Sequence, residues 1–365
     1  MEDGISLWLE VLLLPENRFL LTTHEQYMLR CLQLAEKGMG SAPPNPMVGA
    51  VLVYENRVIG EGWHQVYGGP HAEVNCLDSV KEADRPLVPQ SVLYVSLEPC
   101  AHEGKTPPCT RLIIGSKIPH VVIGCADPFE AVNGRGVQQL RQAGITVTEQ
   151  VLEAECIQLN KRFFNMVQHK RPYITLKWAQ TENGVIGSCN NNRLLISNST
   201  VNRLVHRWRT EEMGILAGFN TIAHDNPQLN NRLWPGRPPW RIVTDPQLEL
   251  PRQAHVFTDG QPTIVFNQKR SAVEGPLHYI RVNACTPEIM LNELYELGIQ
   301  SVLVEGGAKT LQAFIDAGLW NEARVITHTR LQAEPGVRAP VLRAAQLGKE
   351  EWIFDNRIGY YFKQN

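Results

Sequence analysis

The sequence HAEVNCLDSVKEADRPLVPQSVLYVSLEPCAHEGKTPPC at residues 71–109 decides how this chain is interpreted. His71 offers an imidazole, and Cys100 and Cys109 offer thiolates, which are ligand types that hold a tetrahedral Zn²⁺. Three protein ligands leave the fourth position open for water, as in catalytic zinc sites. Glu73 stands where a carboxylate can take a proton from the attacking water and deliver it to a departing amine. The stretch therefore predicts a metal-dependent hydrolysis site.

The spacing of these residues indicates which class of zinc enzyme the chain resembles. Zinc deaminases carry H-x-E followed by P-C-x-x-C, and this chain has His71-Ala72-Glu73 and Pro99-Cys100 but eight residues between its two cysteines. The long form EPCAHEGKTPPC resembles the deaminase half of the bifunctional deaminase/reductase family of riboflavin biosynthesis, as does PNPMVGAVLV at residues 44–53. The resemblance implies a cytidine-deaminase-like, three-layer α/β domain. It also implies deamination of a diaminopyrimidinone ribosyl 5′-phosphate.

Composition limits the other possibilities. A chain of 365 residues with 43% hydrophobic and 20% charged residues predicts two soluble globular domains. No apolar run approaches the length of a membrane span, so we expect no membrane partner. A net charge of −2 gives no basic surface for nucleic acid. The eight cysteines follow no disulfide framework, so a cytoplasmic location is expected.

The chain is expected to divide into four parts. Residues 1–23 precede the start of the family resemblance, lack the features of a secretory signal, and receive no role. Residues 24–150 form the predicted deaminase domain. Residues 151–170 are expected to form a connecting helix, and residues 171–365 form a second α/β domain.

Four residues of the first domain are implied by the resemblance to hold the substrate. Asn45 and His64 would contact the pyrimidine base, although an asparagine between prolines is also common in turns. Lys105 and Thr106 would hold the phosphate, for which an ammonium group and a hydroxyl are suited; a solvated lysine is the alternative.

A second segment resembles the substrate-recognition loop of the family. It contains Asp127 and Arg135. The family usually has asparagine and proline after its Asp-Pro pair, whereas this chain has Phe129 and Glu130. The loop is thus expected to lie beside the substrate but to differ in detail.

The second half of the chain alternates apolar strand-like runs with helical stretches. This pattern predicts a mainly parallel sheet with crossover helices, and no GxGxxG fingerprint follows a strand. RPYITLKWAQTENGVIG at residues 171–187 and SVLVEGGAKTL at residues 301–311 resemble the reductase half of the same family. The resemblance implies a dihydrofolate-reductase-like α/β fold that uses NADPH.

The resemblance also implies site residues of the reductase half, by matching this chain to the family position by position. Lys177 and Glu305 would flank the ribose that is reduced and act as catalytic residues. A Gly-Gly pair between a strand and a helix allows backbone N–H groups to approach a phosphate closely. The residues implied to hold substrate are Arg209, Leu229 and Arg232, and those implied to contact NADPH are Thr221, Asp225, Gly306 and Gly307.

The reductase half departs from the family pattern at three positions. Asn183 replaces an aspartate before glycine, and His224 stands where alanine is common. Leu195 stands where tryptophan is usual before Ile-Ser, which removes a large contact beside the cofactor. The deaminase half therefore matches its family more closely than the reductase half does.

Two alternatives share part of this pattern. A nucleobase or tRNA deaminase has the same zinc chemistry, but would carry an inactive reductase-like assembly domain, and an RNA enzyme usually has a basic face. A zinc-stabilised scaffold without activity would need a closed site with a fourth protein ligand, for instance His102. The favoured interpretation is an enzyme for a phosphorylated pyrimidine, assembled as a homodimer or homotetramer.

Overall fold

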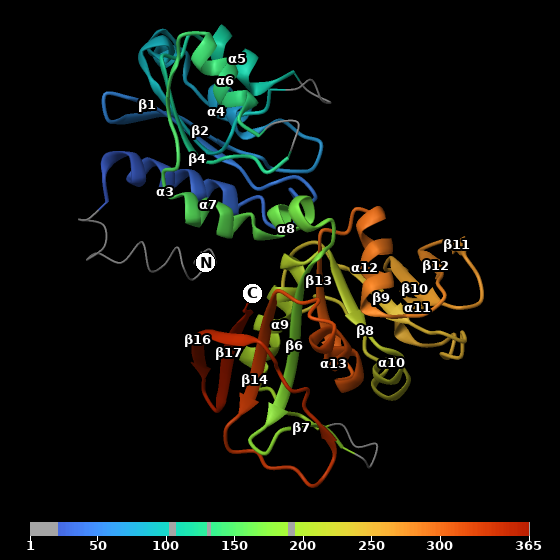
Figure 1. The fold of residues 1–365 in the computed structure, drawn as a ribbon. Helices are drawn as coiled ribbons and strands as arrows, with labels where there is room; N and C mark the ends of the chain where they lie inside the picture. Colours follow the sequence, from blue (N-terminus) through green and yellow to red (C-terminus); the bar gives the residue numbers. More distant parts are fainter. Residues whose placement is uncertain (1–20, 102–106, 130–132, 189–193, 365) are drawn as a thin grey trace. The chain divides into compact units, whose positions relative to one another are not determined.

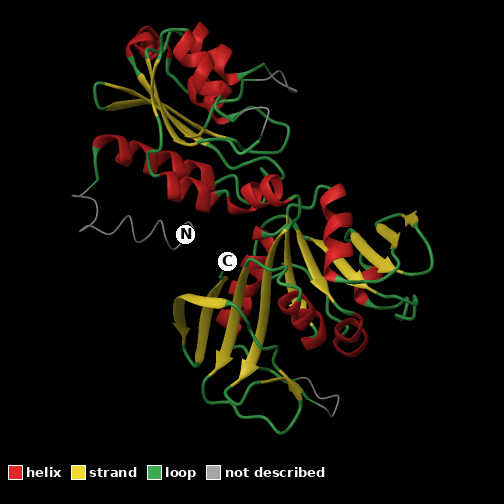
Figure 2. Cartoon of the chain, viewed as in Figure 1, coloured by secondary structure: helices red, strands yellow, loops and turns green. Residues whose placement is uncertain are grey.

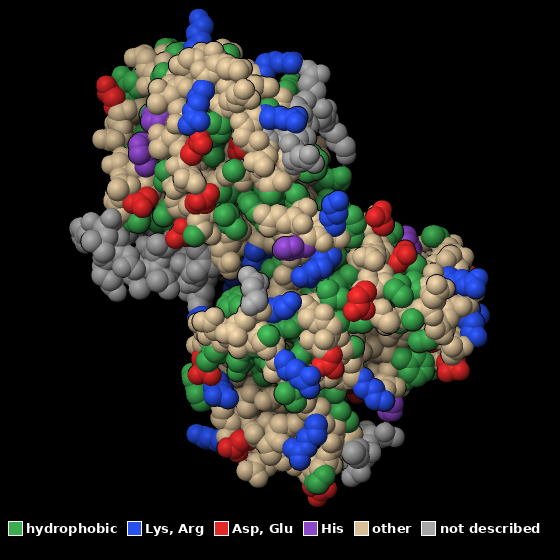
Figure 3. Space-filling view, viewed as in Figure 1, with side chains coloured by type: hydrophobic (Ala, Val, Ile, Leu, Met, Phe, Trp, Pro, Cys, Tyr) green, Lys and Arg blue, Asp and Glu red, His purple; other side chains and the backbone are tan. Residues whose placement is uncertain are grey.

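The computed structural model describes residues 21–101, 107–129, 133–188 and 194–364. The chain forms two compact units (Figure 1), of which the first ends at Gln168 and the second begins at His169. No helix among the described residues is both long and apolar enough to cross a membrane. Figure 3 shows Lys and Arg side chains interspersed with Asp and Glu on the visible face of the second unit.

The first unit is built on a five-stranded sheet in the order β2-β1-β3-β4-β5. β1 pairs antiparallel with β2 and β3, whereas β3, β4 and β5 run parallel. β3 therefore sits at the centre and delivers its carboxyl end to one edge of the sheet. The strands are β1 (Gly49–Tyr54), β2 (Arg57–Trp63), β3 (Val92–Leu97), β4 (His120–Cys125) and β5 (Thr146–Thr148).

Helices cover both faces of this sheet (Figures 1 and 2). Alternate residues of β1 point to opposite sides: Val51 packs in the core under one group of helices and Leu52 in the core under the other. The three-layer prediction is confirmed. The first group is α3 (Thr23–Glu36), α7 (Glu153–Leu159) and α8 (Lys161–His169), and the second is α4 (Ala72–Asp78), α5 (Cys109–Gly115) and α6 (Arg135–Gln142), with a 3₁₀ helix at Glu82–Gln90 before β3.

The segment expected to be a connecting helix forms α7 and α8 and packs into the first unit. Cys156 and Phe164 lie in the same buried cluster as residues of α3. Asn160, between the two helices, accepts a hydrogen bond from the backbone N–H of Met47 and donates one to the carbonyl of Met47, both at 2.8 Å. Because Met47 lies two residues after Asn45, this segment also fixes the backbone beside a predicted substrate residue.

The second unit contains a ten-stranded sheet in the order β11-β12-β10-β9-β8-β13-β6-β14-β17-β16. Seven neighbouring strands, from β12 to β14, run parallel, and antiparallel strands flank them. The mainly parallel prediction is confirmed. The parallel strands are β6 (Tyr173–Thr181), β8 (Gly214–Ala217), β9 (Trp240–Thr244), β10 (Thr263–Asn267), β12 (Leu277–Arg281), β13 (Ser301–Gly306) and β14 (Glu322–His328), and the flanking strands are β11 (Ala272–Glu274), β16 (Ala345–Ile353) and β17 (Asn356–Lys363).

Crossover helices cover the two faces of this larger sheet. In β13, Val302 and Val304 pack in the cluster that includes residues of α12 (Pro287–Glu296) and α13 (Ala308–Asp316), whereas Leu303 packs against α9 (Ser199–Glu211). α10 (Phe219–Asp225) and α11 (His255–Thr258) lie over the same side as α9. A small separate sheet joins β7 (Val185–Gly187) to β15 (Val337–Arg338).

Candidate active sites

The three predicted metal ligands come together from three elements of the first unit. His71 is the N-cap residue of α4, Cys100 follows β3, and Cys109 begins α5. The Nδ1 atom of His71 lies 3.3 Å from Sγ of Cys109 and 3.6 Å from Sγ of Cys100. All three ligand atoms lie within 4.8 Å of one another.

This arrangement fits Zn²⁺. A tetrahedral ion with Zn–N of about 2.1 Å and Zn–S of about 2.3 Å separates its nitrogen and sulfur ligands by roughly 3.5 Å. Hydrogen bonding with Cys109 and His71 lowers the pKa of the Cys100 thiol, and the backbone N–H of Cys109 donates to Sγ of Cys100 at 3.3 Å. Among the described residues no fourth histidine, cysteine or carboxylate joins the group. His102, the fourth ligand of the scaffold alternative, lies outside them.

Glu73 lies in the first turn of α4, beside this cluster. Its side chain is 3% exposed, and burial raises the pKa of its carboxyl group, which the neighbouring His71 opposes. A buried carboxyl group with a raised pKa is suited to receive and return a proton during one reaction cycle. Glu73 is not itself one of the clustered ligands.

Asn45 and His64 are hydrogen-bonded to each other near the metal ligands. Nδ1 of His64 lies 2.9 Å from the carbonyl oxygen of Pro70, which only accepts, so Nδ1 carries the proton. Nε2 of His64 then accepts from Nδ2 of Asn45 at 3.1 Å. Burial lowers the pKa of His64, whose ring packs edge-on against His71. The pair leaves the amide oxygen of Asn45 available to a ligand. Lys105 and Thr106 lie outside the described residues.

The predicted catalytic residues of the second unit lie together under α9. Lys177 on β6 and Glu305 on β13 occupy the alternate positions that face α9, and Nζ of Lys177 lies 3.7 Å from Oε2 of Glu305. Arg209, near the end of α9, donates from Nε to Oε1 of Glu305 at 2.6 Å and from Nη2 to Oε2 at 2.8 Å. A carboxylate is thus held between two cations, where the carboxyl end of β13 lies beside the middle of β6.

These charges set one another's protonation. Burial acts to raise the pKa of Glu305, but Arg209 and Lys177 together lower it to about 2. Burial lowers the pKa of Lys177, which Glu305 opposes and Arg209 reinforces. The ammonium group of Lys177 is therefore a stronger acid than an exposed lysine.

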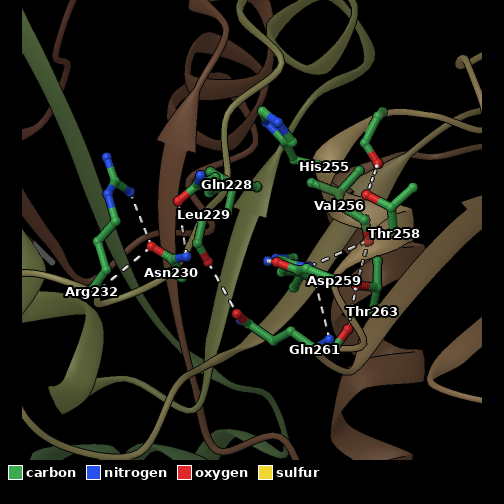
Figure 4. Close-up of polar contacts among 12 residues, drawn as sticks. Gln228, Leu229, Asn230, Arg232, His255, Val256, Thr258, Asp259, Gln261 and Thr263 are labelled. Atoms are coloured by element: carbon green, nitrogen blue, oxygen red, sulfur yellow. Dashed lines mark hydrogen bonds and ion pairs between the residues drawn. The ribbon is translucent and has the colours of Figure 1, made fainter.

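Two of the predicted substrate residues, Leu229 and Arg232, lie in the segment after α10 (Figure 4), and Arg209 of α9 contacts this segment. Nη1 of Arg209 donates to the carbonyl of Asn230 at 2.6 Å. Nη1 of Arg232 donates to the side-chain oxygen of Asn230 at 3.0 Å, as Figure 4 shows. Leu229, at φ 48°, is 3% exposed and packs in the core below α10. Its carbonyl accepts from Gln261 at 3.5 Å. The side chain of Leu229 is therefore core, and only its backbone can face a substrate.

The predicted dinucleotide residues fall into two groups. Gly306 and Gly307 lie against Thr221: a Cβ on Gly306 would come within 2.9 Å of the Thr221 side chain, and Gly307 has φ +76°. Both glycines are thus required by close packing and backbone conformation. Asp225 is exposed at the last residue of α10, one turn beyond Thr221.

Each departure from the family pattern has a local structural setting. Nδ2 of Asn183 donates to the carbonyl of Ala333 at 2.8 Å while its Oδ1 accepts from the Ala333 N–H at 3.2 Å, and an aspartate would lack the donor. Leu195 is 74% exposed. The ring of His224 bonds the carbonyl of Asn220 within α10 at 2.7 Å.

Sequence reasoning missed His206, which belongs to the second site. It lies one helical turn before Arg209 on α9 and is buried. Its Nδ1 accepts from the backbone N–H of Leu233 at 3.3 Å, so α9 holds the segment around Asn230 at two points. Burial, reinforced by Arg209 and Arg232, lowers the pKa of His206 to about 4. The spacing of three residues from Arg209 on one helix was the available signal.

A zinc deaminase domain joined to a reductase domain is the class that these two sites define, and comparisons with known proteins agree. Residues 21–125 match the cytidine and deoxycytidylate deaminase zinc-binding region, and residues 172–331 match the RibD C-terminal domain. Riboflavin biosynthesis protein RibD of Aquifex aeolicus is 38% identical over 317 residues, covering 85% of this chain and 88% of that protein. RibD of Escherichia coli is 32% identical over 328 residues, covering 84% and 88%.

Solved structures give the same result. A diaminohydroxyphosphoribosylaminopyrimidine deaminase/5-amino-6-(5-phosphoribosylamino)uracil reductase from Thermotoga maritima matches with TM-score 0.87 and 35% identity, covering 93% of this chain and 98% of that one. RibD of Acinetobacter baumannii matches with TM-score 0.84 and 28% identity, covering 94% and 99%. The chain belongs to the RibD family of bifunctional riboflavin biosynthesis enzymes, with a zinc-binding, cytidine-deaminase-like domain and a dihydrofolate-reductase-like domain that implies NADPH.

Proposed function

We propose that the first unit deaminates a diaminopyrimidinone ribosyl 5′-phosphate and that the second unit reduces the ribose of the product to a ribityl chain. The observation that carries this proposal is the three-ligand cluster of His71, Cys100 and Cys109 with the buried Glu73 beside it. The name of the related T. maritima protein supports the choice of reaction.

In the deaminase site, His71, Cys100 and Cys109 would hold Zn²⁺, which would supply a nucleophilic water near neutral pH. Glu73 takes one proton from the attacking water and passes it to the ring amine, which leaves as ammonia. The second proton of the water moves to the adjacent ring nitrogen as a carbonyl forms on the ring carbon. The amide oxygen of Asn45 accepts a hydrogen bond from the pyrimidine, and His64 keeps that amide in orientation. Lys105 and Thr106 hold the 5′-phosphate.

In the reductase site, NADPH supplies the hydride. Lys177 gives a proton to the ribose oxygen as the ring opens, and Glu305 holds the Lys177 ammonium toward the sugar. The proton and the hydride together convert the ribosyl group to ribityl, and NADP⁺ remains. The proposed substrate contacts are Arg209, the backbone of Leu229, and Arg232, and the proposed NADPH contacts are Thr221, Asp225, Gly306 and Gly307.

We further propose a cytoplasmic homo-oligomer, either dimer or tetramer. Exposed apolar side chains on the β16–β17 hairpin, including Trp352 and Phe354, support association through the second unit. The proposed domain limits remain residues 24–150 and 171–365, with residues 1–23 without an assigned role and residues 151–170 between the domains. Light scattering of the purified chain tests the assembly, and a single monomeric mass would contradict it.

One assay tests both activities. The zinc-loaded protein is mixed with the diaminopyrimidinone ribosyl phosphate, and ammonia release and NADPH absorbance are followed in the same cuvette. We expect ammonia release followed by NADPH oxidation. Ammonia without loss of NADPH would contradict the reductase proposal, and neither signal would contradict both. Deamination of tRNA or a free base in place of this substrate would support the nucleobase deaminase alternative.

A further inference from the structure

Glu98 is a buried carboxylate that the proposed mechanism does not use. It follows β3, two residues before Cys100, and is 3% exposed. Its Oε2 accepts from the backbone N–H groups of Asp127 at 3.3 Å and Gly134 at 3.0 Å. Its Oε1 accepts from those of Gly136 at 2.9 Å and Val137 at 3.3 Å. One side chain therefore gathers four backbone donors from the loop before α6 and from the first turn of that helix.

The chemistry of the side chain suits this task. A carboxylate offers two oxygens that only accept, with about four lone-pair positions, which matches four N–H donors. Negative charge is also favourable at the N-terminus of a helix, where the first N–H groups lack partners within the helix. A glutamine at this position would keep one accepting oxygen and turn an N–H group toward backbone donors.

The start of α6 lies directly against the metal-ligand segments. A Cβ on Gly136 would come within 2.2 Å of the carbonyl oxygen of Pro99, so only glycine permits this approach. Gln139, one turn further on, accepts from the hydroxyl of Thr110 at 2.8 Å and donates to the carbonyl of Ala101 at 3.5 Å. Ala101 and Thr110 each follow a predicted metal ligand. Glu98 thus fixes the start of α6, which contacts the segments of both cysteines, in position beside the deaminase site.

We infer that Glu98 is a positioning residue for the deaminase reaction, holding the loop before α6 and the first turn of α6 against the substrate position. The described residues of this loop are 126–129 and 133–134. This inference deepens the proposed function and rests on it. Glu98 acts through backbone groups of the loop and of α6. Its loss should weaken substrate binding while the metal and the chemical step are retained.

The test compares Glu98→Gln with Glu149→Gln, which makes the same chemical change at an exposed ion pair of the same unit. We expect Glu98→Gln to raise KM for ammonia release by about tenfold or more, because hydrogen bonds that hold the loop and the first turn of α6 are lost. The expected change in kcat is less than about threefold. Zinc content should stay at one per chain, and Glu149→Gln should match the wild type.

A second measurement needs no activity. Amide hydrogen exchange of the described peptide 133–142, which carries three of the four bonded N–H groups, should become about tenfold faster in Glu98→Gln and not in Glu149→Gln. Unchanged exchange and unchanged KM would overturn the inference. Loss of zinc from Glu98→Gln would also overturn it, because Glu98 would then support Cys100 and not the loop. Wild-type protein that releases no ammonia would contradict the proposed function itself, and the exchange comparison would still test the hold of Glu98 on the loop.

Discussion

Arg209 and Glu305 form a bidentate ion pair in the second unit, with Nε to Oε1 at 2.6 Å and Nη2 to Oε2 at 2.8 Å. The same guanidinium donates from Nη1 to the carbonyl of Asn230 at 2.6 Å. Arg209 therefore connects the Glu305 carboxylate, which is predicted to be catalytic, to the segment that carries Leu229 and Arg232. The two side chains are 12% and 7% exposed, so the pair is shielded from water.

Glu305→Gln should unfold the second unit more readily and impair reduction. The change leaves Arg209 and Lys177 buried without their counter-charge, and breaking a buried pair typically costs about 3–5 kcal/mol. Chemical denaturation and NADPH oxidation are the measurements. Glu274→Gln, at an exposed pair with Arg270, is the control and should leave the unfolding midpoint unchanged. A Glu305→Gln protein with normal stability and turnover would contradict both roles.

Glu73→Gln should keep its zinc and lose deamination. Glutamine preserves the shape beside the metal ligands but cannot accept and return a proton, so ammonia release should fall by about 10²–10⁴-fold. Zinc content by atomic absorption and the ammonia assay give the two readings. NADPH oxidation with the deaminated product supplied directly should remain at the wild-type rate. Near-normal ammonia release would remove Glu73 from the mechanism.

His206 should make the second unit less stable in mild acid. Its pKa is about 4 in the folded chain, below the ordinary value of 6.5, so the folded state favours the neutral ring. The contribution of the neutral His206 ring to the stability of the folded state is complete above pH 6.5 and is lost as the pH falls from there toward 4. In His206→Asn the amide oxygen can replace Nδ1 as acceptor but does not titrate. Between pH 7 and pH 5 the free energy of unfolding should therefore fall by about 1–2 kcal/mol less in His206→Asn than in the wild type.

Urea unfolding of the wild type and His206→Asn at pH 7, 6 and 5 measures this difference. The subtraction cancels the other titrating groups. Parallel losses of stability in the two proteins over this range would show that His206 does not titrate as stated.

Leu195→Trp should tighten NADPH binding. Leu195 is 74% exposed at the position where the family usually has tryptophan, and an aromatic ring there restores a stacking surface. We expect the Kd for NADPH to fall by about threefold to tenfold, measured by fluorescence titration. Val273→Trp adds the same ring at an exposed position of β11 and should leave the Kd unchanged. An equal Kd in wild type and Leu195→Trp would show that residue 195 does not contact the cofactor.

The sequence alone determined the parts of this protein that depend on residue type and short spacing. His71, Glu73, Cys100 and Cys109 were predicted together because a zinc site needs imidazole and thiolate ligands, and proton transfer needs a carboxylate beside them. The alternation of strands and helices likewise predicted both sheets, since burial of apolar runs follows local periodicity.

Only the tertiary structure decided how distant segments meet. Asn160 bonds the backbone of Met47, Glu98 gathers the N-terminus of α6, and Arg209 joins Glu305 to Asn230. Such contacts depend on how the chain folds, because a buried backbone N–H can donate to, and a buried carbonyl can accept from, any suitable polar group that the fold brings within reach. The residue types suited to the chemistry can therefore be predicted from the sequence, whereas the residues that hold them in position are identified only from the tertiary structure.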